Sequence, residues 1–486
     1  MTRSAANNPA GAKAIDEPQP LAVSEMVFQG LKTLASLKLT VVLFALSIFL
    51  VFAGTLVQVD KGIWTVVDEY FRCYFTWIDF QIFFPRSMEI PGGFWFPGGW
   101  LIGGLLLVNI LAAHAVRFTI KARGQRLTIG LIVLVIGIIL TGLVIAGVFQ
   151  QDVAATEDAA FWRVLLRLIK GGVAAGILLA GCMMLFNKRA GIVLLHAGII
   201  LMLLSELVTG LYAVEGQMRI KEGQTVNYVY HTKDFELAVI DPSDTEWNNV
   251  TAIDENALST GALINDARLP FDIQVDQYMP NSTLVRPTQA PNLPNPATAG
   301  TGREIIAVEQ PEASGADPNQ SVDVASAYVT FLNKDTGEPM GKYLLSGWIS
   351  FQDIPQRITV GNTTYLVYLR FARTYKPYSV HLIDFRHETY MGTNKPKDFS
   401  AHVRLLDPSR GVDREVRIWM NNPLRYAGET FYQSSFDPDD PTVTVLQVVK
   451  NAGWMVPYVA CMIVATGMCA HFGMYLVSFL RKRGTA

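Results

Sequence analysis

Residues 37–57 read LKLTVVLFALSIFLVFAGTLV, and this stretch decides the class of fold. After Lys38 it contains no charged side chain. Its length is close to the roughly 20 apolar residues that a helix needs to cross the hydrocarbon core of a bilayer. Five further stretches have the same character, namely residues 99–116, 127–149, 171–186, 190–212 and 453–480. The pattern predicts a multi-pass α-helical membrane protein with about six spans.

The composition supports a membrane protein and excludes several other classes. Of the 486 residues, 50% are hydrophobic and only 17% are charged, whereas a soluble domain carries roughly a quarter charged residues. The net charge of −2 excludes a broad basic surface for nucleic acid, so we expect no nucleic-acid partner. The four cysteines include no Cys-x-x-Cys pair, which argues against a disulfide scaffold or a Cys-rich zinc site.

Basic residues predict the orientation of the spans. They flank the predicted spans at Lys32, Lys38, Arg117, Lys121, Arg123, Arg126, Lys188, Arg189, Arg481, Lys482 and Arg483. Six spans would place all of these residues on one side, which the positive-inside rule assigns to the cytoplasm. We therefore expect cytoplasmic termini in the cell (inner) membrane. Arg163, Arg167 and Lys170 fall on the other side, either in an interfacial amphipathic helix or in a span with snorkelling cations.

The chain divides into four predicted segments. Residues 1–35 are expected to be a disordered cytoplasmic N-terminus, and residues 36–212 a membrane domain with five spans. Residues 213–449 form a hydrophilic block large enough for its own core, and residues 450–486 hold the last span and a basic cytoplasmic tail.

Strand patterns dominate the hydrophilic block. Short runs rich in β-branched and aromatic residues lie at 235–240, 271–275, 327–332, 364–371, 402–406, 416–420 and 443–449. Such runs, separated by turn signals, predict a large extracytoplasmic, mainly β domain, either a sandwich or an open barrel. The stretch 280–323, rich in Pro, Asn, Ala and Thr, is expected to be a long loop.

Three histidines lie within the predicted spans, where an ionisable residue is costly and therefore a functional candidate. His196 lies roughly 11 Å inward of Arg189, and His471 roughly 15 Å inward of Arg481, at about 1.5 Å per residue. Two imidazoles at matched depth could hold a haem iron, which makes His196 and His471 the predicted ligands. Ala197, Gly198, Ala470 and Gly473 would let the helices approach closely. The alternative is that each histidine only hydrogen-bonds a helix carbonyl.

His114 lies nearer the predicted cytoplasmic interface, three residues before Arg117. It is either an interfacial polar residue or part of the place where haem would first bind.

Several segments resemble the ResB family of cytochrome c biogenesis proteins. They are Ser36–Thr40 with Ala53–Gln58, Tyr375–Val380 with Asp384–Phe385, Asp398–Val403, and Met420–Leu424 with Gly428 and Phe431–Phe436. The order of spans and the large domain before the last helix are also similar. Family members commonly have four spans, whereas residues 127–186 here add two.

The resemblance implies a role in cytochrome c maturation. ResB-like proteins work with a CcsA-type haem-handling membrane partner, and the pair moves haem across the bilayer and presents it to apocytochrome c. The family contributes an intramembrane histidine to haem binding, and His196 is the first residue to which this role transfers. The Trp-rich haem loop of the partner family is absent. The resemblance therefore implies a non-catalytic subunit of a haem-attaching (cytochrome c synthase) complex that binds haem b transiently.

Two other functions remain open at this point. One is a b-type electron-transfer subunit in which the same histidines hold a permanent haem. The other is a membrane-anchored interaction scaffold without haem, whose histidines only pack.

Overall fold

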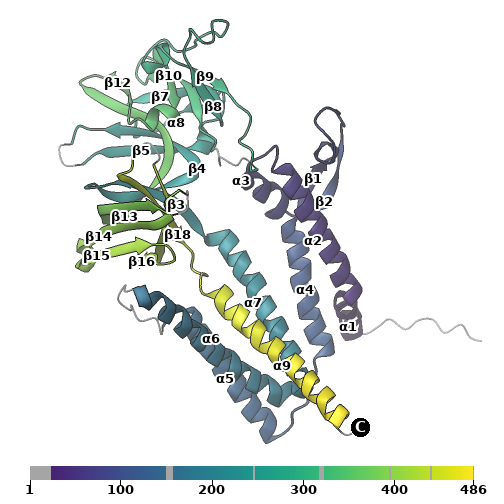
Figure 1. The fold of residues 1–486 in the computed structure, drawn as a ribbon. Helices are drawn as coiled ribbons and strands as arrows, with labels where there is room; N and C mark the ends of the chain where they lie inside the picture. Colours follow the sequence, from purple (N-terminus) through teal and green to yellow (C-terminus); the bar gives the residue numbers. More distant parts are fainter. Residues whose placement is uncertain are drawn as a thin grey trace, which may run out of the picture.

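The structure is a computed structural model that describes residues 23–148, 157–244, 247–316, 322–392, 396–437 and 440–484. Long helices form one end of the molecule and a β-rich domain forms the other (Figure 1). The long helices are α1 (Val23–Leu34), α2 (Leu37–Val57), α4 (Gly99–Arg117), α5 (Gln125–Ile145), α6 (Glu157–Phe186), α7 (Ala190–Tyr212) and α9 (Val456–Gly484).

The multi-pass helical architecture is confirmed. Five segments of the described residues are long and apolar enough to cross a membrane, and one of them, Leu165–Tyr212, contains most of α6 and all of α7. The 3-10 turn Asn187–Arg189 separates these two helices, with a positive φ of 51° at Asn187. Asparagine tolerates this left-handed conformation better than most residues. Arg167 lies inside the continuous α6, so no break separates the basic segment from the span.

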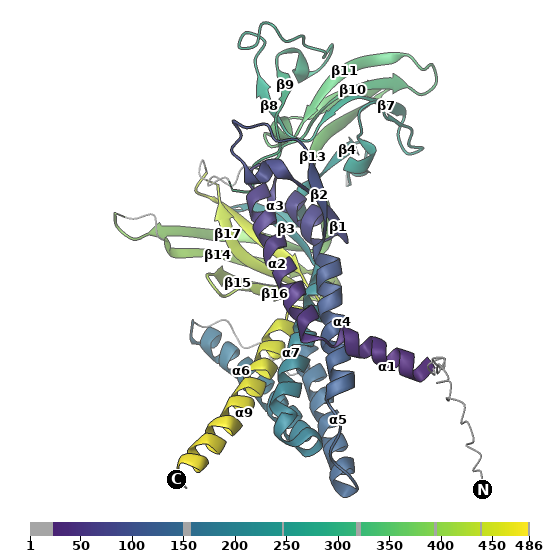
Figure 2. The same ribbon diagram turned by 90° about the vertical axis from the view of Figure 1, so that its right-hand side faces the viewer.

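A helix occupies part of the N-terminal segment that we expected to be disordered. Residues 1–22 lie outside the described part, but Val23–Leu34 form α1, which packs against α4. Its apolar residues recur at helical spacing, at positions 23, 26, 27, 31 and 34, which is the pattern of an amphipathic helix. Figure 2 shows α1 projecting sideways from the end of α2. The expectation of disorder is therefore wrong for these residues.

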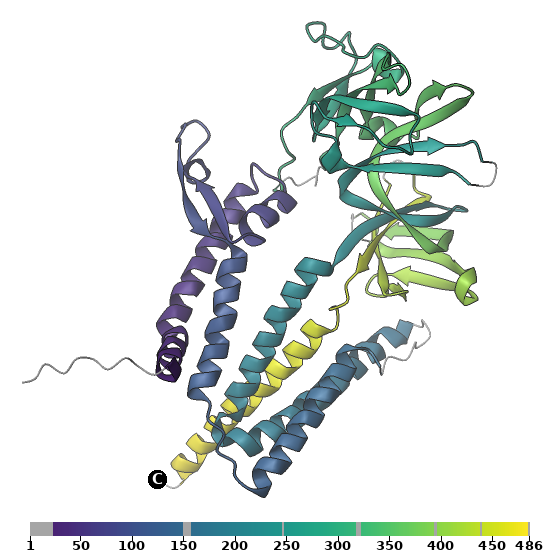
Figure 3. The same cartoon turned by 180° about the vertical axis from the view of Figure 1, so that it is seen from behind.

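The helices form two groups with separate apolar cores. The first helix group consists of α1, α2 and α4, with the short helix α3 (Ile63–Val66) and the hairpin β1 (Phe75–Asp79)–β2 (Gly93–Pro97). Its core includes Leu43 and Ile102. The second helix group consists of α5, α6, α7 and α9, with Leu178 and Leu194 in its core. The groups converge toward the end opposite the β-rich domain (Figure 3), where α4 contacts α7.

The predicted basic clusters gather at this convergent end. Arg117 Nη2 donates to the carbonyl of Ala35 at 2.7 Å, and Arg189 Nη1 donates to the carbonyl of Arg117 at 2.8 Å. The backbone N–H of Lys121 donates to the carbonyl of Leu185 at 3.0 Å. The ends of α2, α4, α6 and α7 are thus tied together by cationic segments. Which side of a membrane this end faces stays a prediction.

Glycines allow α7 and α9 to cross with their backbones in contact. A Cβ atom at Gly191 would lie 2.8 Å from both the carbonyl oxygen of Gly467 and the backbone nitrogen of His471. A Cβ atom at Gly198 would lie 2.6 Å from a methyl carbon of Val464. Backbone atoms cannot move aside as a flexible side chain can, so this crossing depends on the absence of a side chain.

Gly191→Leu is therefore expected to destabilise the second helix group by about 1–3 kcal/mol, the usual cost of overpacking. The measurement is the thermal unfolding midpoint of the full chain in detergent. Gly210→Leu is the matched control, because Gly210 lies on the same helix with open space around it. Both variants gain the same helix propensity, so equal midpoints would contradict the crossing described here.

The β-rich domain begins with β3 after α7 and ends with β18 before α9. Its strands are β3 (Val214–Lys221), β4 (Thr225–Asp241), β5 (Asn249–Asp254), β6 (Leu263–Ile264), β7 (Phe271–Met279), β8 (Ser282–Val285), β9 (Ile306–Glu309), β10 (Ser326–Asn333), β11 (Pro339–Ser346), β12 (Gln356–Val360), β13 (Thr363–Thr389), β14 (Pro396–Asp407), β15 (Val412–Trp419), β16 (Leu424–Tyr426), β17 (Glu429–Phe436) and β18 (Val443–Lys450). The short helix α8 (Gly347–Ser350) precedes β12.

The domain contains two cores that share the long strands β4 and β13. The ten-stranded sheet follows the order β15-β14-β13-β4-β3-β18-β17-β16, with β12 and β5 pairing beside it. One core lies between part of this sheet and the four-stranded sheet β11-β10-β7-β6, around Phe271 and Phe331. The second lies inside the curled remainder, around Phe431, where a bridge between Trp419 and Asn422 nearly closes the sheet. The domain is part sandwich and part open barrel.

Each of the seven strands predicted from the sequence overlaps a strand of the structure, namely β4, β7, β10, β13, β14, β15 and β18, although the run 416–420 extends one residue beyond β15. The stretch 280–323 is less simple than the predicted loop, because β8 and β9 pair within it. Residues 317–321 of that stretch lie outside the described residues.

At the end opposite the contact between α4 and α7, a second contact joins the first helix group to the β-rich domain. We call it the loop contact and define it as residues 58–65 with residues 312–316. Ser314 Oγ donates to the carbonyl of Gln58 at 3.0 Å, and the Gly315 N–H donates to the carbonyl of Lys61 at 3.0 Å. Glu312 Oε1 accepts from the Gly62 N–H at 3.1 Å. The first helix group is thus held at both of its ends.

Candidate functional site

His114 lies on the face of α4 that contacts α7. Its Nδ1 is 3.0 Å from the carbonyl oxygen of Ile110, and because a carbonyl only accepts, Nδ1 must donate. The neutral ring then carries its lone pair on Nε2, which is buried without a hydrogen-bond partner in the structure. Metal-ligating histidines usually have this arrangement, with one ring N–H bonded to a carbonyl and the other nitrogen free. His114 therefore has the hydrogen-bonding arrangement of a metal ligand.

His196 on α7 meets His114 directly. The two ring centroids are 5.0 Å apart and the planes cross at 75°. Nδ1 of His196 is also buried without a hydrogen-bond partner. Phe118 stacks on His114 at 4.6 Å and meets His196 edge-on at 6.2 Å. Two imidazoles with orphaned nitrogens thus share one aromatic cluster between α4 and α7.

His471 lies at a different helix interface. Its ring meets Tyr475 at 4.8 Å and Phe472 at 5.3 Å, and its backbone lies against Gly191. Gly191 and Gly198 face α9, whereas His196, five residues after Gly191, faces α4. The structure therefore brings His196 together with His114, and places His196 and His471 on different faces of α7.

Only some of the small residues near the histidines lie at a contact between helices. Gly198 is buried against α9, as the prediction required. Ala197 and Gly473 are exposed, so they do not contribute to a close approach of helices within this chain.

An open cavity of about 460 Å³ adjoins the imidazole pair, lined by Arg117, Phe118, Arg189 and Ile192. Phe118 belongs to both the cavity and the aromatic cluster. The sequence analysis did not single out these residues as a binding site. Helical spacing could have identified them. Arg117 is three residues from His114, and Ile192 and Arg189 are four and seven residues from His196. Residues at these spacings share one helix face.

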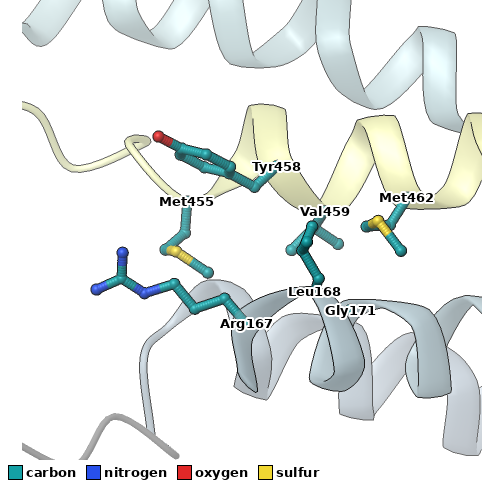
Figure 4. Close-up of a pocket in the computed structure, with 7 residues that line it drawn as sticks. All are labelled: Arg167, Leu168, Gly171, Met455, Tyr458, Val459 and Met462. Carbon is teal, nitrogen blue, oxygen red and sulfur yellow. The ribbon is translucent and has the colours of Figure 1, made fainter. Parts of the chain in front are cut away.

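A second cavity lies between α6 and α9, near the β-rich domain (Figure 4). Its volume of about 60 Å³ equals roughly two water molecules at ~30 Å³ each. It is lined by Arg167, Leu168, Gly171, Met455, Tyr458, Val459 and Met462. The guanidinium of Arg167 lies 5.0 Å from the ring centroid of Trp454, a cation–π distance. This cavity is too small for a macrocycle.

The β-rich domain contains a buried polar cluster built from two of the motif segments. Lys376 Nζ donates to Glu429 Oε1 at 2.6 Å, and the Tyr378 hydroxyl donates to Glu429 Oε2. Burial, followed by the adjacent Glu429 carboxylate, raises the pKa of Tyr378 above its usual range. The hydroxyl therefore stays protonated and acts as a donor. In the described ranges, no three His, Cys, Asp or Glu side chains are grouped to hold a metal ion.

Comparison with known proteins adds a family to this geometry. Residues 354–451 match the ResB-like family. The chain is also 36% identical over 92 residues to Protein NrfI of Wolinella succinogenes, an alignment that covers 19% of this chain. The alignment covers 10% of the Wolinella protein, so the chain matches about a tenth of the length of this curated relative. The family match contains the cluster of Lys376, Tyr378 and Glu429.

Proposed function

We propose that this chain serves cytochrome c biogenesis as a membrane subunit that holds haem, since its residues 354–451 match the ResB-like family. In this proposal it carries haem across the membrane and, with a CcsA-type partner, presents it to apocytochrome c. The family match supports the role in biogenesis. The handling of haem rests on the residues between α4 and α7.

The pair His114–His196 is the observation that carries the proposal. Both imidazoles have a buried nitrogen without a hydrogen-bond partner in the structure, as does His471 at Nδ1, and an unsatisfied buried polar group is costly unless a ligand satisfies it. The contact between the two rings is what singles out the pair His114–His196. His114 Nε2 is the better prepared ligand, because Ile110 already fixes its tautomer. The rings touch at 5.0 Å, so they would have to separate for a macrocycle to lie between them.

His114 thus replaces His471 as the proposed partner of His196. The sequence predicted His196 and His471 as ligands from their matched depth. Depth follows from the rise per residue, but the face of the helix decides which side chains meet. His471 faces neither His114 nor the cavity, and its ring contacts within the described residues are with Phe472 and Tyr475.

The orientation is proposed from charge. The convergent basic end would face the cytoplasm, which places both termini there and the β-rich domain outside, in the cell (inner) membrane. Attachment of haem would use cysteines of the apocytochrome rather than a nucleophile of this chain. The contribution of this subunit would be to bind and position haem, with the β-rich domain as the surface on which the CcsA-type partner and apocytochrome c dock.

Haem absorption of the purified full chain tests the proposed ligands. His114→Ala and His196→Ala are each expected to lower or shift the haem absorption band, because each removes an iron ligand, and added imidazole should restore it. His471→Ala is the matched control and should keep the wild-type spectrum. A spectrum that depends on His471 and not on His114 would contradict the pair proposed here. Absence of haem from the protein and its partner together would favour the scaffold alternative.

A further inference from the structure

We propose that the cavity between α4 and α7 recognises a porphyrin by its two propionate carboxylates, which Arg117 and Arg189 bind. The porphyrin ring would lie against Phe118 and Ile192, on the side of the cavity that leads to the imidazoles. This inference rests on the proposed function, since it names the part of haem that this chain recognises besides iron.

The two helices present matching rows of side chains along their contact. On α4, His114 is followed by Arg117 and Phe118, and on α7, Arg189 and Ile192 precede His196. Because the helices run in opposite directions, each row has a cation at the basic end and an imidazole farther along the helix. Ile192 lies between the two in the sequence of α7, and the ring of Phe118 stacks on His114 beside α4. A ligand that fits both rows is negatively charged at one end, flat and apolar in the middle, and able to accept imidazole ligation.

Backbone carbonyls position both guanidinium groups at the cavity. Arg189 Nη1 donates to the carbonyl of Arg117 at 2.8 Å, and Arg117 Nη2 donates to the carbonyl of Ala35 at 2.7 Å. A guanidinium has five N–H donors in a rigid planar fork and binds carboxylates in a bidentate manner. A fixed arginine loses less conformational entropy on binding than a mobile one.

The size and lining of the cavity favour a large amphipathic anion. Its volume of about 460 Å³ lies within the range of roughly 300–1,000 Å³ that small-molecule sites occupy. Its four lining residues carry two positive charges and no carboxylate. A small inorganic anion would leave the faces of Phe118 and Ile192 uncovered, whereas a porphyrin dicarboxylate would bury them and gain hydrophobic free energy.

Metal-free protoporphyrin IX is the probe that tests the cavity without iron ligation. Its binding to the full chain in nonionic detergent is measured by fluorescence and compared with that of its dimethyl ester. The diacid is expected to bind about tenfold more tightly than the diester, because only its carboxylates can form charge-assisted hydrogen bonds with the two guanidinium groups. Equal affinities for the diacid and the diester would overturn the proposal without any mutation.

Variants assign the effect to the two arginines. Arg117→Gln and Arg189→Gln are each expected to weaken diacid binding about tenfold and to leave diester binding unchanged. Arg117→Lys and Arg189→Lys should retain part of the preference for the diacid, which shows that the fold survives. Arg123→Gln is the matched control, because Arg123 is an exposed cation at the same end but outside the cavity. Wild-type binding by both Gln variants would overturn the proposal.

The same probe separates this inference from the proposed iron ligands. His114→Ala and His196→Ala should keep the preference for the diacid over the diester while losing the haem spectrum. If the arginine variants no longer bind protoporphyrin IX but the histidine variants still bind haem, the result supports the cavity as the porphyrin site and contradicts His114 and His196 as the iron ligands. If lysophosphatidylglycerol displaces protoporphyrin IX as readily as haem does, the cavity is a lipid phosphate site and the proposal is overturned.

Discussion

Glu429→Leu is expected to destabilise the β-rich domain by about 3–5 kcal/mol, because it leaves Lys376 buried without its counter-charge. The side chains of Lys376 and Glu429 are only 14% and 8% exposed. The Tyr378 hydroxyl would lose its acceptor as well. At roughly 2–4 °C per kcal/mol for a domain of this size, the thermal midpoint of the full chain should fall by about 6–20 °C.

Two further variants make this expectation specific. The double variant Lys376→Met with Glu429→Leu should recover most of the lost stability, since replacing a whole buried ion pair with apolar residues is often close to neutral. Asp413→Asn is the exposed control, because Arg404 and Asp413 pair on the neighbouring strands β14 and β15 with both side chains about half exposed. It should change the midpoint little. An equal fall for Asp413→Asn and Glu429→Leu would contradict the role of burial.

Glu236→Leu should cost a similar amount, about 3–5 kcal/mol, at a second buried ion pair of the domain. Arg370 Nε lies 2.9 Å from Glu236 Oε1, across the β13–β4 pairing, and the two side chains are 7% and 9% exposed. Arg370 Nη2 is already buried without a hydrogen-bond partner in the structure. Removal of Glu236 would therefore leave a permanently charged, buried group without its counter-charge.

The reverse substitution, Arg370→Met, should destabilise less than Glu236→Leu. A carboxylate that loses its partner can take up a proton and become neutral, whereas a guanidinium in a protein does not deprotonate. Thermal midpoints of the two variants, with Asp384→Asn at the exposed Arg386–Asp384 pair as the control, measure this difference. A larger loss for Arg370→Met would contradict the account.

Hydropathy predicted the helices well because an uninterrupted apolar run has few alternatives to a helix in a bilayer. The bounds of α2 and α7 coincide with the predicted stretches 37–57 and 190–212. Amphipathic α1 was missed because its short, mixed sequence lacks a membrane signal. The seven strands were found from alternation, but the two cores were not, because long strands such as β13 pair with partners distant in the sequence.

Two of the three histidines predicted for the site lie together in the structure, and their binding of haem stays a prediction. His114 and His196 were both named from the cost of an ionisable residue within a span, and the structure places them together. The pairing of His196 with His471 could not be tested by residue counting, since the rise per residue fixes depth and not direction. The stripe of Gly191 and Gly198, seven residues apart, marks the face of α7 that contacts α9. That stripe indicated that His196, which lies off it, does not face α9.

The loop contact limits how the two helix groups can move. The first group is fastened to the second through α4 and α7 at the basic end, and to the β-rich domain through residues 58–65 and 312–316 at the other. Any rotation that parts α4 from α7 must therefore either break the hydrogen bonds of Ser314 and Gly315 or pull residues 312–316 along. A separation of α4 from α7 is in this way mechanically coupled to the β-rich domain.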